Sequence, residues 1–458
     1  MKRVLLKLRS YVVNKFSVAK ILASSFLFMI IMGTLLLSLP ISNNREVLPL
    51  IDNLFTATSA TCVTGLLTTV ALEQYSVFGR FVILILIQFG GLGLMSFISI
   101  VLMFIKTKLE FKERMLMKDA LNKMDFSDLR HYIYGIFKFT FFFEILGALI
   151  MSPVLIAEYD FLGGIAQSIF LSVSAFCNAG IDCFGATSLM AYQNNPIIVF
   201  TVAALIITGG LGFAVWFDYK EKLGLLVRFK KNVYKKLNIH TKLVTAITVS
   251  LILFGMVFIF VAEYNNSMAS LSLPSKIMNS FFNSVTLRTA GFYTIDYSVL
   301  NRITKVFMCI FMLIGGSPGG TAGGIKTTTF FLLIIMTISD IRNEKHMHVY
   351  GKHILKKNFI KAYVVFIFYL ASIILAFMTL LVSENFDALD LLFEIVSAIG
   401  TVGLSTGLTP LLSGFGKVVI IVLMFIGRVG PITIAYSLRK STRNDTGIRY
   451  PQTEIMVG

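Results

Sequence analysis

Four short stretches of the sequence combine small or hydroxylated residues with a glycine that an apolar residue follows. They read TATSATCVTGLLTTV, LSVSAFCNAGIDCFG, FNSVTLRTAGFYTID and EIVSAIGTVGLSTGL, and their glycines are Gly65, Gly180, Gly291 and Gly403. Glycine reaches backbone conformations that side chains exclude, and it brings no side chain toward a neighbour. Such stretches present backbone carbonyl oxygens, which can replace the hydration shell of an ion. The chemistry that they predict is coordination of a cation.

The spacing of these stretches indicates an internal repeat. The four loop glycines follow one another at intervals of 115, 111 and 112 residues. A second glycine cluster follows each of them after 25, 29, 24 and 24 residues, beginning at Gly90, Gly209, Gly315 and Gly427. A helix kink or close helix packing would explain any single copy, but four copies in register indicate four equivalent units.

The composition indicates the solvent in which these units fold. Hydrophobic residues make up 56% of the 458 positions, and the mean hydropathy is +0.80. These values are typical of a polytopic membrane protein. Irregular backbone at membrane depth is tolerated only where protein buries it or where it lines a water-filled cavity. Four loops that meet on one axis would satisfy that condition, and half-helices that point their C-terminal ends at the loops would favour a cation.

We therefore expect an all-α membrane protein with four pseudo-symmetric repeats, each made of an apolar helix, a half-helix, a glycine loop and a second apolar helix. The first helices are expected near 18–40, 132–155, 241–263 and 360–382, and the second near 78–105, 196–217, 303–339 and 416–438. The half-helices are expected near 51–61, 164–176, 275–287 and 388–399, with caps at Asp52–Asn53 and Pro274–Ser275. The repeats occupy 1–106, 107–220, 221–340 and 341–458, which gives eight spans and four re-entrant half-helices.

The charges alternate along the chain. The formal net charge is +17, and the basic residues gather in every second connection, at 2–20, 106–130, 220–242, 342–361 and 439–449. This alternation is the positive-inside pattern and predicts that both termini are cytoplasmic. Binding of nucleic acid or anionic lipid would explain the charge but not its alternation. The four cysteines form no CxxC pair, so we expect packing thiols, with a Cys177–Cys183 bridge as the alternative.

The glycine loops and the stretch GGSPGGTAGGIKTTT at 315–329 resemble the Trk/Ktr/HKT superfamily of potassium transport proteins, most closely its Ktr-type membrane subunit. The resemblance runs from about residue 18 to the C-terminus. It implies that each loop supplies one quarter of a potassium filter. Glycine in all four loops goes with potassium in that superfamily, whereas serine in the first loop accompanies sodium transport in some plant members. The implied filter residues are Val63, Thr64, Gly65, Asn178, Ala179, Gly180, Thr289, Ala290, Gly291, Thr401, Val402 and Gly403.

The resemblance also implies an intramembrane gate beneath the filter. A phosphate loop is disfavoured for this stretch, because Ile325 separates Gly324 from Lys326. Arg428 matches a family arginine that faces the cavity, and its alternative is a structural salt bridge. Lys326 either repels potassium or anchors the loop. The implied gate residues are Gly315, Gly316, Ser317, Pro318, Gly319, Gly320, Thr321, Ala322, Gly323, Gly324, Lys326 and Arg428.

Three further charges lie inside apolar stretches, where charges are functional by default. Arg288 directly precedes the third filter loop. On the ion path its side chain would block permeation, so we expect it to brace the filter from behind. Asp182 is either the partner of Arg288 or an outer attractor of cations. We expect Glu144 to hydrogen-bond a neighbouring helix.

The functional prediction is potassium uptake across the bacterial plasma membrane, with potassium as the transported ion and no cofactor in this chain. The resemblance implies a homodimer in the lipid membrane on a cytosolic ring of regulatory (KtrA-like) subunits that bind ATP or ADP. No nucleic-acid partner is expected. Coupled symport with sodium or protons, or an unrelated solute symporter with inverted repeats, is the alternative. A polytopic membrane enzyme would need clustered His, Asp or Glu residues within the membrane. The five histidines lie instead near basic cytoplasmic stretches, so an enzyme is not expected.

Overall fold

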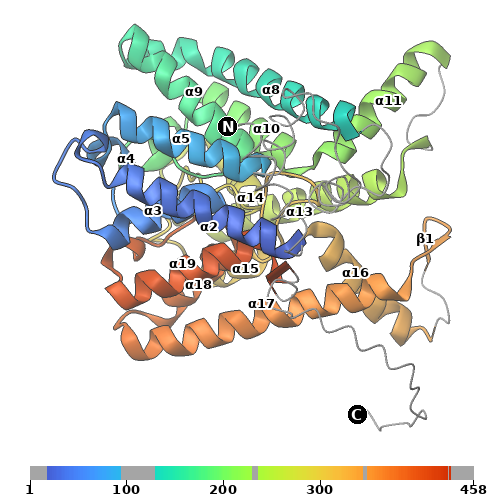
Figure 1. The fold of residues 1–458 in the computed structure, drawn as a ribbon. Coiled ribbons are helices and arrows are strands. Elements are labelled where there is room, and N and C mark those ends of the chain that lie inside the picture. The colour runs from blue at the N-terminus through green and yellow to red at the C-terminus, as the bar shows by residue number, and fades with distance from the viewer. Residues whose placement is uncertain (1–17, 94–128, 230–235, 344–347, 432, 435–458) are drawn as a thin grey trace, which may run out of the picture.

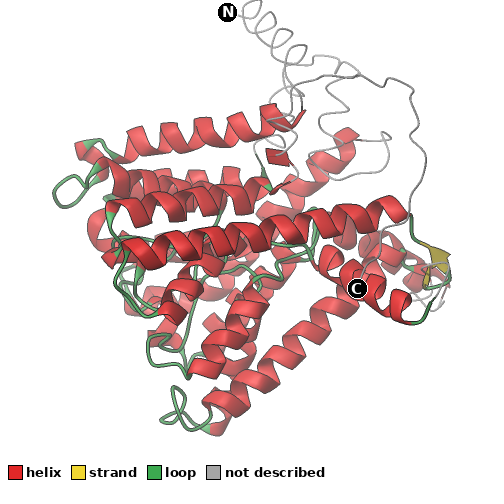
Figure 2. Ribbon diagram, turned by 90° about the horizontal axis from the view of Figure 1, so that it is seen from below, coloured by secondary structure: helices red, strands yellow, loops and turns green. Residues whose placement is uncertain are grey.

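The computed structural model of the protein describes residues 18–93, 129–229, 236–343, 348–431 and 433–434. Helices form almost all of the described secondary structure and lie side by side in one bundle (Figure 2). Most of the predicted basic segments, namely those at the two termini and after residue 106, lie outside the described residues, as do the continuation of the second helix beyond 93 and residues 230–235.

Four long apolar helices begin the four repeats. They are α2 (Val18–Leu37), α8 (Leu129–Glu158), α13 (Ile239–Glu263) and α17 (Lys356–Ser383), close to the predicted ranges. Within the described ranges, these are the helices whose length and hydropathy suffice to cross a membrane, or one more if a bent pair counts as a span. Large apolar side chains stand exposed along them, as Phe28, Phe142, Val261 and Leu375 do. Exposure of this kind fits a surface that faces lipid.

Four shorter helices, here called the half-helices, each lead into a glycine loop. They are α3 (Leu50–Cys62), α9 (Phe161–Cys177), α14 (Leu273–Thr286) and α18 (Ala388–Gly400). The predicted caps are wrong. α3 is preceded by Pro49, and Asp52 lies inside its first turn. α14 is capped by Ser272, whose hydroxyl accepts from the Ser275 N–H. Pro274 lies inside the first turn, where its missing N–H needs no partner.

The second helices differ most from the prediction. α5 (Val77–Leu92) and α19 (Gly414–Val429) are continuous. The predicted helix 196–217 is wrong, since α10 (Pro196–Gly210) ends and α11 (Phe213–Phe229) leaves it at 94°. Gly212, with φ +91°, makes this turn. The third unit is interrupted as expected, between α15 (Arg302–Met312) and α16 (Thr327–Ile341). The count of eight spans stays a prediction.

Short elements complete the described chain. They are η1 (Pro40–Ser42), α4 (Ala71–Gln74), η2 (Ser188–Tyr192), β1 (His348–Val349), β2 (Lys352–His353) and η3 (Thr409–Leu411). The two strands form an antiparallel hairpin that projects beyond α16 and α17 (Figure 1). The two larger hydrophobic cores lie within the bundle, one mostly among the helices of the first two repeats and the other mostly among those of the last two.

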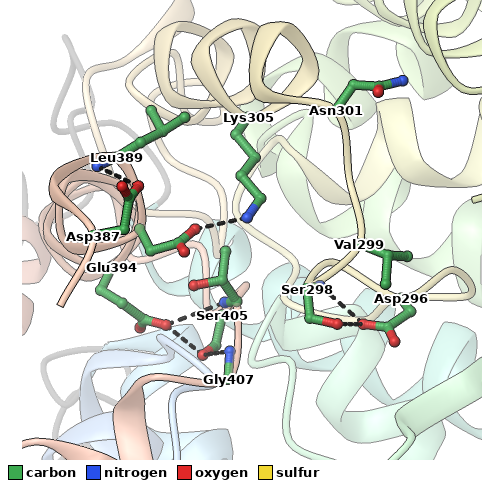
Figure 3. Close-up of polar contacts among 12 residues, drawn as sticks. Asp296, Ser298, Val299, Asn301, Lys305, Asp387, Leu389, Glu394, Ser405 and Gly407 are labelled. Carbon is green, nitrogen blue, oxygen red and sulfur yellow. Dashed lines mark hydrogen bonds and ion pairs between the residues drawn. The ribbon is translucent and has the colours of Figure 1, made fainter.

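Two ion pairs, each with one buried partner, join neighbouring repeats at the same register. The Lys305 Nζ atom lies 2.7 Å from the Asp390 carboxylate (Figure 3). The Lys417 Nζ atom lies 2.6 Å from the Asp52 carboxylate. Each lysine follows a loop glycine by 14 residues, and each aspartate precedes the next repeat's loop glycine by 13. The second helix of one repeat is thus tied to the half-helix of the next.

Removal of one partner should destabilise the protein more than removal of both. The side chains of Lys417 and Asp52 are 14% and 10% exposed, so K417M leaves a buried carboxylate without its cation. We expect a loss of about 3 kcal/mol in K417M and a partial recovery in K417M/D52N. Thermal unfolding in detergent measures both. R45M is the control, because the Arg45–Glu73 pair is exposed and should cost less than about 1 kcal/mol. Equal losses in the single and double variants would contradict this prediction.

Candidate ion-conduction site

The four glycine loops share one backbone conformation. The residue two positions before each loop glycine has a left-handed φ: Val63 (56°), Asn178 (59°), Thr289 (69°) and Thr401 (52°). The loop glycines also have positive φ: Gly65 (105°), Gly180 (68°), Gly291 (82°) and Gly403 (89°). Positive φ is rare for β-branched residues and persists only where the surroundings impose it. Its recurrence in four loops identifies a specified structure.

The four loop glycines lie against one another in a closed ring. A methyl group built on Gly65 would lie 3.2 Å from the Cα atoms of both Gly180 and Gly403. One built on Gly291 would lie 2.8 Å from the Cα atom of Gly180 and 3.4 Å from that of Gly403. Segments more than 300 residues apart therefore meet at one point, and no side chain fits between them.

Backbone carbonyls alternate with the glycines around this ring. The methyl group built on Gly403 would lie 2.0 Å from the Thr64 carbonyl oxygen. The same construction places a carbonyl 2.6 to 2.8 Å from each of the other glycines, namely that of Ala179 at Gly65, Ala290 at Gly180 and Val402 at Gly291. In every case the carbonyl belongs to the residue that precedes the neighbouring loop's glycine. Four carbonyl dipoles thus gather where four loops of the chain meet, which is an arrangement that can coordinate a dehydrated cation.

A hydroxyl group on each half-helix holds its loop. The hydroxyls of Ser59 and Ser397 accept from the N–H groups of Gly65 and Gly403, at 3.0 and 3.1 Å. Those of Ser174 and Thr286 donate to the carbonyls of Ile181 and Phe292, at 2.5 and 2.6 Å. In every repeat a half-helix hydroxyl thus fixes the loop, by accepting in the first and fourth repeats and by donating in the second and third.

Three threonine hydroxyls beside the ring have no hydrogen-bond partner although they are buried. They belong to Thr64, Thr289 and Thr401. A buried polar group without a partner is costly unless water or an ion satisfies it. Together with the ring carbonyls they form a set of neutral oxygen atoms, which suits a hard cation. Among the described residues, no group of three His, Cys, Asp or Glu side chains could hold a metal ion.

An outer cavity of about 360 Å³ opens on one side of the ring. All four loop glycines line it, together with Asp182 and Tyr293. The Asp182 carboxylate accepts from the Ser188 hydroxyl at 2.5 Å and from the Phe184 N–H at 3.1 Å. These partners, rather than Arg288, satisfy Asp182, so the predicted Asp182–Arg288 pair is not formed. The Nε and Nη2 atoms of Arg288 have no hydrogen-bond partner.

The glycine-rich loop between α15 and α16, here called the inner loop (residues 313–326), packs on the opposite side of the ring. The Ser317 N–H donates to the Gly210 carbonyl at 2.9 Å. The Thr321 hydroxyl donates at 3.0 Å to the Phe176 carbonyl, at the end of a half-helix. A methyl group built on Gly323 would lie 2.0 Å from the Thr401 hydroxyl oxygen. The inner loop therefore contacts the end of one half-helix, α9, and the filter residue Thr401 of the fourth repeat directly.

Arg428 joins the inner loop to another repeat. Its guanidinium donates to the Thr321 carbonyl of the inner loop and to the carbonyls of Gly90 and Gly91 in the last turn of α5, the Gly91 bond being 3.0 Å long. These acceptors are backbone carbonyls, and no carboxylate of the described chain pairs with it, which removes the support for a salt bridge. The Lys326 ammonium donates to the Ala322 carbonyl at 2.6 Å and so ties the inner loop to itself.

The glycine clusters of the second helices allow close packing. Methyl groups built on Gly90, Gly209 and Gly427 would lie 2.0, 1.9 and 2.1 Å from the carbonyls of Thr61, Phe176 and Ile399. These carbonyls lie four residues before the loop glycine in each of the three repeats. In these three repeats the second helix thus packs closely against the end of the half-helix.

The remaining expectations concern side chains behind the ring. The hydrogen bond predicted for Glu144 is confirmed, because the Gln88 amide of α5 donates to it at 3.2 Å. The alternative of a Cys177–Cys183 bridge is wrong, since all four cysteines are free and buried. Glu394 was not among the site residues predicted from the sequence. The available signal was that it is a carboxylate in the middle of a half-helix.

Comparison with known proteins identifies the family. The model of the TrkH family, described as cation transport protein, matches residues 10–447. The chain belongs to this family of cation transporters. It is 38% identical over 446 residues to the Ktr system potassium uptake protein B of Bacillus subtilis, covering 97% of both chains. It is also 38% identical to the potassium/sodium uptake protein NtpJ of Enterococcus hirae, covering 97% of this chain and 98% of the relative.

A solved structure supports the fold. The potassium transporter TrkH from Vibrio parahaemolyticus superposes with a TM-score of 0.69 at 18% identity, covering 91% of this chain and 85% of that chain. Family and fold together place the chain among multi-pass membrane transport proteins rather than enzymes.

Proposed function

We propose that this chain takes up potassium across the plasma membrane through a filter formed by the four glycine loops. The observation that carries the proposal is the closed ring of Gly65, Gly180, Gly291 and Gly403, with a carbonyl beside each glycine. Carbonyl oxygens at this point replace the water around the ion, and the half-helices direct their negative ends toward it. The names of the Bacillus subtilis and Enterococcus hirae relatives support potassium as the ion.

The inner loop acts as the gate in this proposal. It lies on the opposite side of the ring from the outer cavity, and Arg428 holds it against α5. In the closed state the loop blocks the path from the ring to the cytosol. Opening requires the guanidinium to release at least one of its acceptors. A homodimer on a cytosolic nucleotide-binding ring, as in Ktr systems, would act by shifting this equilibrium.

Coupled transport of sodium is the second candidate. The relative from Enterococcus hirae is named a potassium/sodium uptake protein, and it is as similar to this chain as the Bacillus relative is. The first loop has glycine at the position where serine goes with sodium in part of the superfamily, which favours potassium.

Rubidium uptake into proteoliposomes tests the proposal. Purified protein should take up labelled rubidium, and external potassium should compete for uptake far better than sodium does. A requirement for sodium or for a proton gradient at fixed membrane potential would instead support coupled transport. Failure of the folded protein to take up rubidium under all of these conditions would refute the proposed function. Empty liposomes provide the background.

A further inference from the structure

Glu394, in the middle of α18, has a buried carboxylate that is hydrogen-bonded to the chain just beyond the fourth loop glycine (Figure 3). It accepts hydrogen bonds from the Ser405 hydroxyl, the Thr406 N–H at 3.2 Å and the Thr409 hydroxyl at 2.7 Å. The Ser405 hydroxyl in turn accepts from the Gly407 N–H at 2.9 Å, so its own hydrogen is directed at Glu394. Glu394 is only 1% exposed.

The charge of Glu394 is balanced in a different way from that of the other half-helix carboxylates. Asp52 and Asp390, in the first turns of α3 and α18, each pair with a lysine. No lysine or arginine of the described residues pairs with Glu394, and each of its three contacts is a donor. An ionised carboxylate accepts from all three, and hydrogen bonds to a charged acceptor are the strong ones. The segment just beyond the fourth loop glycine is therefore held by three donors on one carboxylate.

The corresponding ties in two other repeats are neutral. In the second repeat the Gln167 amide donates to the Cys183 carbonyl at 2.9 Å. In the third repeat the Asn283 amide donates to the Thr294 hydroxyl at 3.0 Å. Cys183 and Thr294 follow their loop glycines by three residues, as Thr406 follows Gly403. The residue three positions after the loop glycine is thus tied to the half-helix in these three repeats, although the helix residue lies at a different register in each, and only in the fourth is that helix residue a carboxylate.

Gly403 lies between two anchors that both originate in α18. Its own N–H donates to the Ser397 hydroxyl at 3.1 Å. Glu394 fixes the chain two, three and six residues later. Ser405, the first of these, lines the outer cavity next to the ring. A shift of this segment would move the Val402 and Gly403 carbonyls, whose positions decide how well a given ion replaces its water.

We infer that Glu394 is a positioning residue that sets the ion preference of the filter by fixing the outer part of the fourth loop. The inference rests on the proposed function. The residue does not touch the ion: it acts through the segment 405–409 on the carbonyls of the ring. Its loss should widen the range of ions accepted before it stops transport.

The variant E394Q tests this inference. Glutamine removes the negative charge, and an amide nitrogen in place of the Oε2 oxygen cannot accept from the Thr409 hydroxyl, so that charge-assisted bond is lost. We expect the rubidium-to-sodium uptake ratio to fall about tenfold, which corresponds to the loss of one charge-assisted hydrogen bond. T409V, which removes one donor without a change of shape, should lower the ratio less. The ratio is independent of the amount of folded protein, so a merely destabilising role would leave it unchanged.

D296N is the matched control. Asp296 also follows a loop glycine and accepts from the N–H and hydroxyl of Ser298, at 2.9 and 2.7 Å, but it is exposed (Figure 3). It should keep the wild-type ratio. A folded E394Q with the wild-type ratio would overturn the inference, and if E394Q does not fold, a wild-type ratio in T409V would do so. Absence of rubidium uptake by the wild-type protein would instead refute the proposed function.

Discussion

Replacing Gly403 by alanine should abolish selective rubidium uptake. The methyl group would lie 2.0 Å from the Thr64 carbonyl oxygen and 2.8 Å from the Cα atom of Gly65. Both are backbone atoms, which cannot move aside as the end of a side chain can. The carbonyl that the methyl group displaces is one of the four at the ring, so the steric effect falls directly on the proposed ion site.

Gly185 provides the control for backbone strain. It has φ +107°, compared with +89° for Gly403, and lines the same outer cavity, but a methyl group built there meets nothing within 4 Å. Alanine at either position pays about 1–2 kcal/mol for the left-handed conformation. G185A should therefore lose some thermal stability and keep its rubidium uptake, whereas G403A should lose uptake by at least about a hundredfold. Similar rubidium uptake in the two variants would mean that the glycine ring is not the path of the ion.

The sequence predicted the parts of the fold that depend on local pattern. The loop glycines recur at nearly constant intervals, and the long apolar helices stand out because lipid-facing and buried surfaces are both apolar. The turn at Gly212 was missed because apolar residues continue on both sides of it, so hydropathy does not mark the break between α10 and α11. The Phe213 N–H donates to the Gly319 carbonyl of the inner loop at 3.1 Å, and this contact between distant segments supports the bend at Gly212.

The candidate site, like the fold, was predictable where it depends on local sequence pattern. The four loops could be located from their glycine and hydroxyl residues, because the same pattern recurs in all four repeats. The partners of single charges could not be located. Lys417 and Asp52 are 365 residues apart, and Arg428 bonds to carbonyls that every residue possesses. Glu394 binds hydroxyls only 11 to 15 residues away, yet those serines and threonines resemble any polar loop until the chain is folded.

Replacing Arg428 by alanine should raise rubidium flux about tenfold or more. The guanidinium makes charge-assisted bonds to Thr321 of the inner loop and to Gly90 and Gly91 of α5. Each such bond contributes about 1.5–3 kcal/mol, and 1.4 kcal/mol shifts an equilibrium tenfold. Loss of these bonds should release the loop and increase the open population. Single-channel recording or rubidium efflux from loaded liposomes measures the change. R302A, at the exposed start of α15, is the control for loss of positive charge.

R428K separates a latch from an electrostatic barrier. Lysine keeps the charge but lacks the planar fork that reaches two separate segments at once. A barrier made by the charge alone would keep R428K at the wild-type flux, whereas a latch between the inner loop and α5 would let R428K rise toward R428A. Deletion of residues 319–322 removes the acceptor on the loop side, so it should raise flux as R428A does, and the two changes combined should add little. Full additivity would mean that Arg428 and the inner loop restrict the ion path independently.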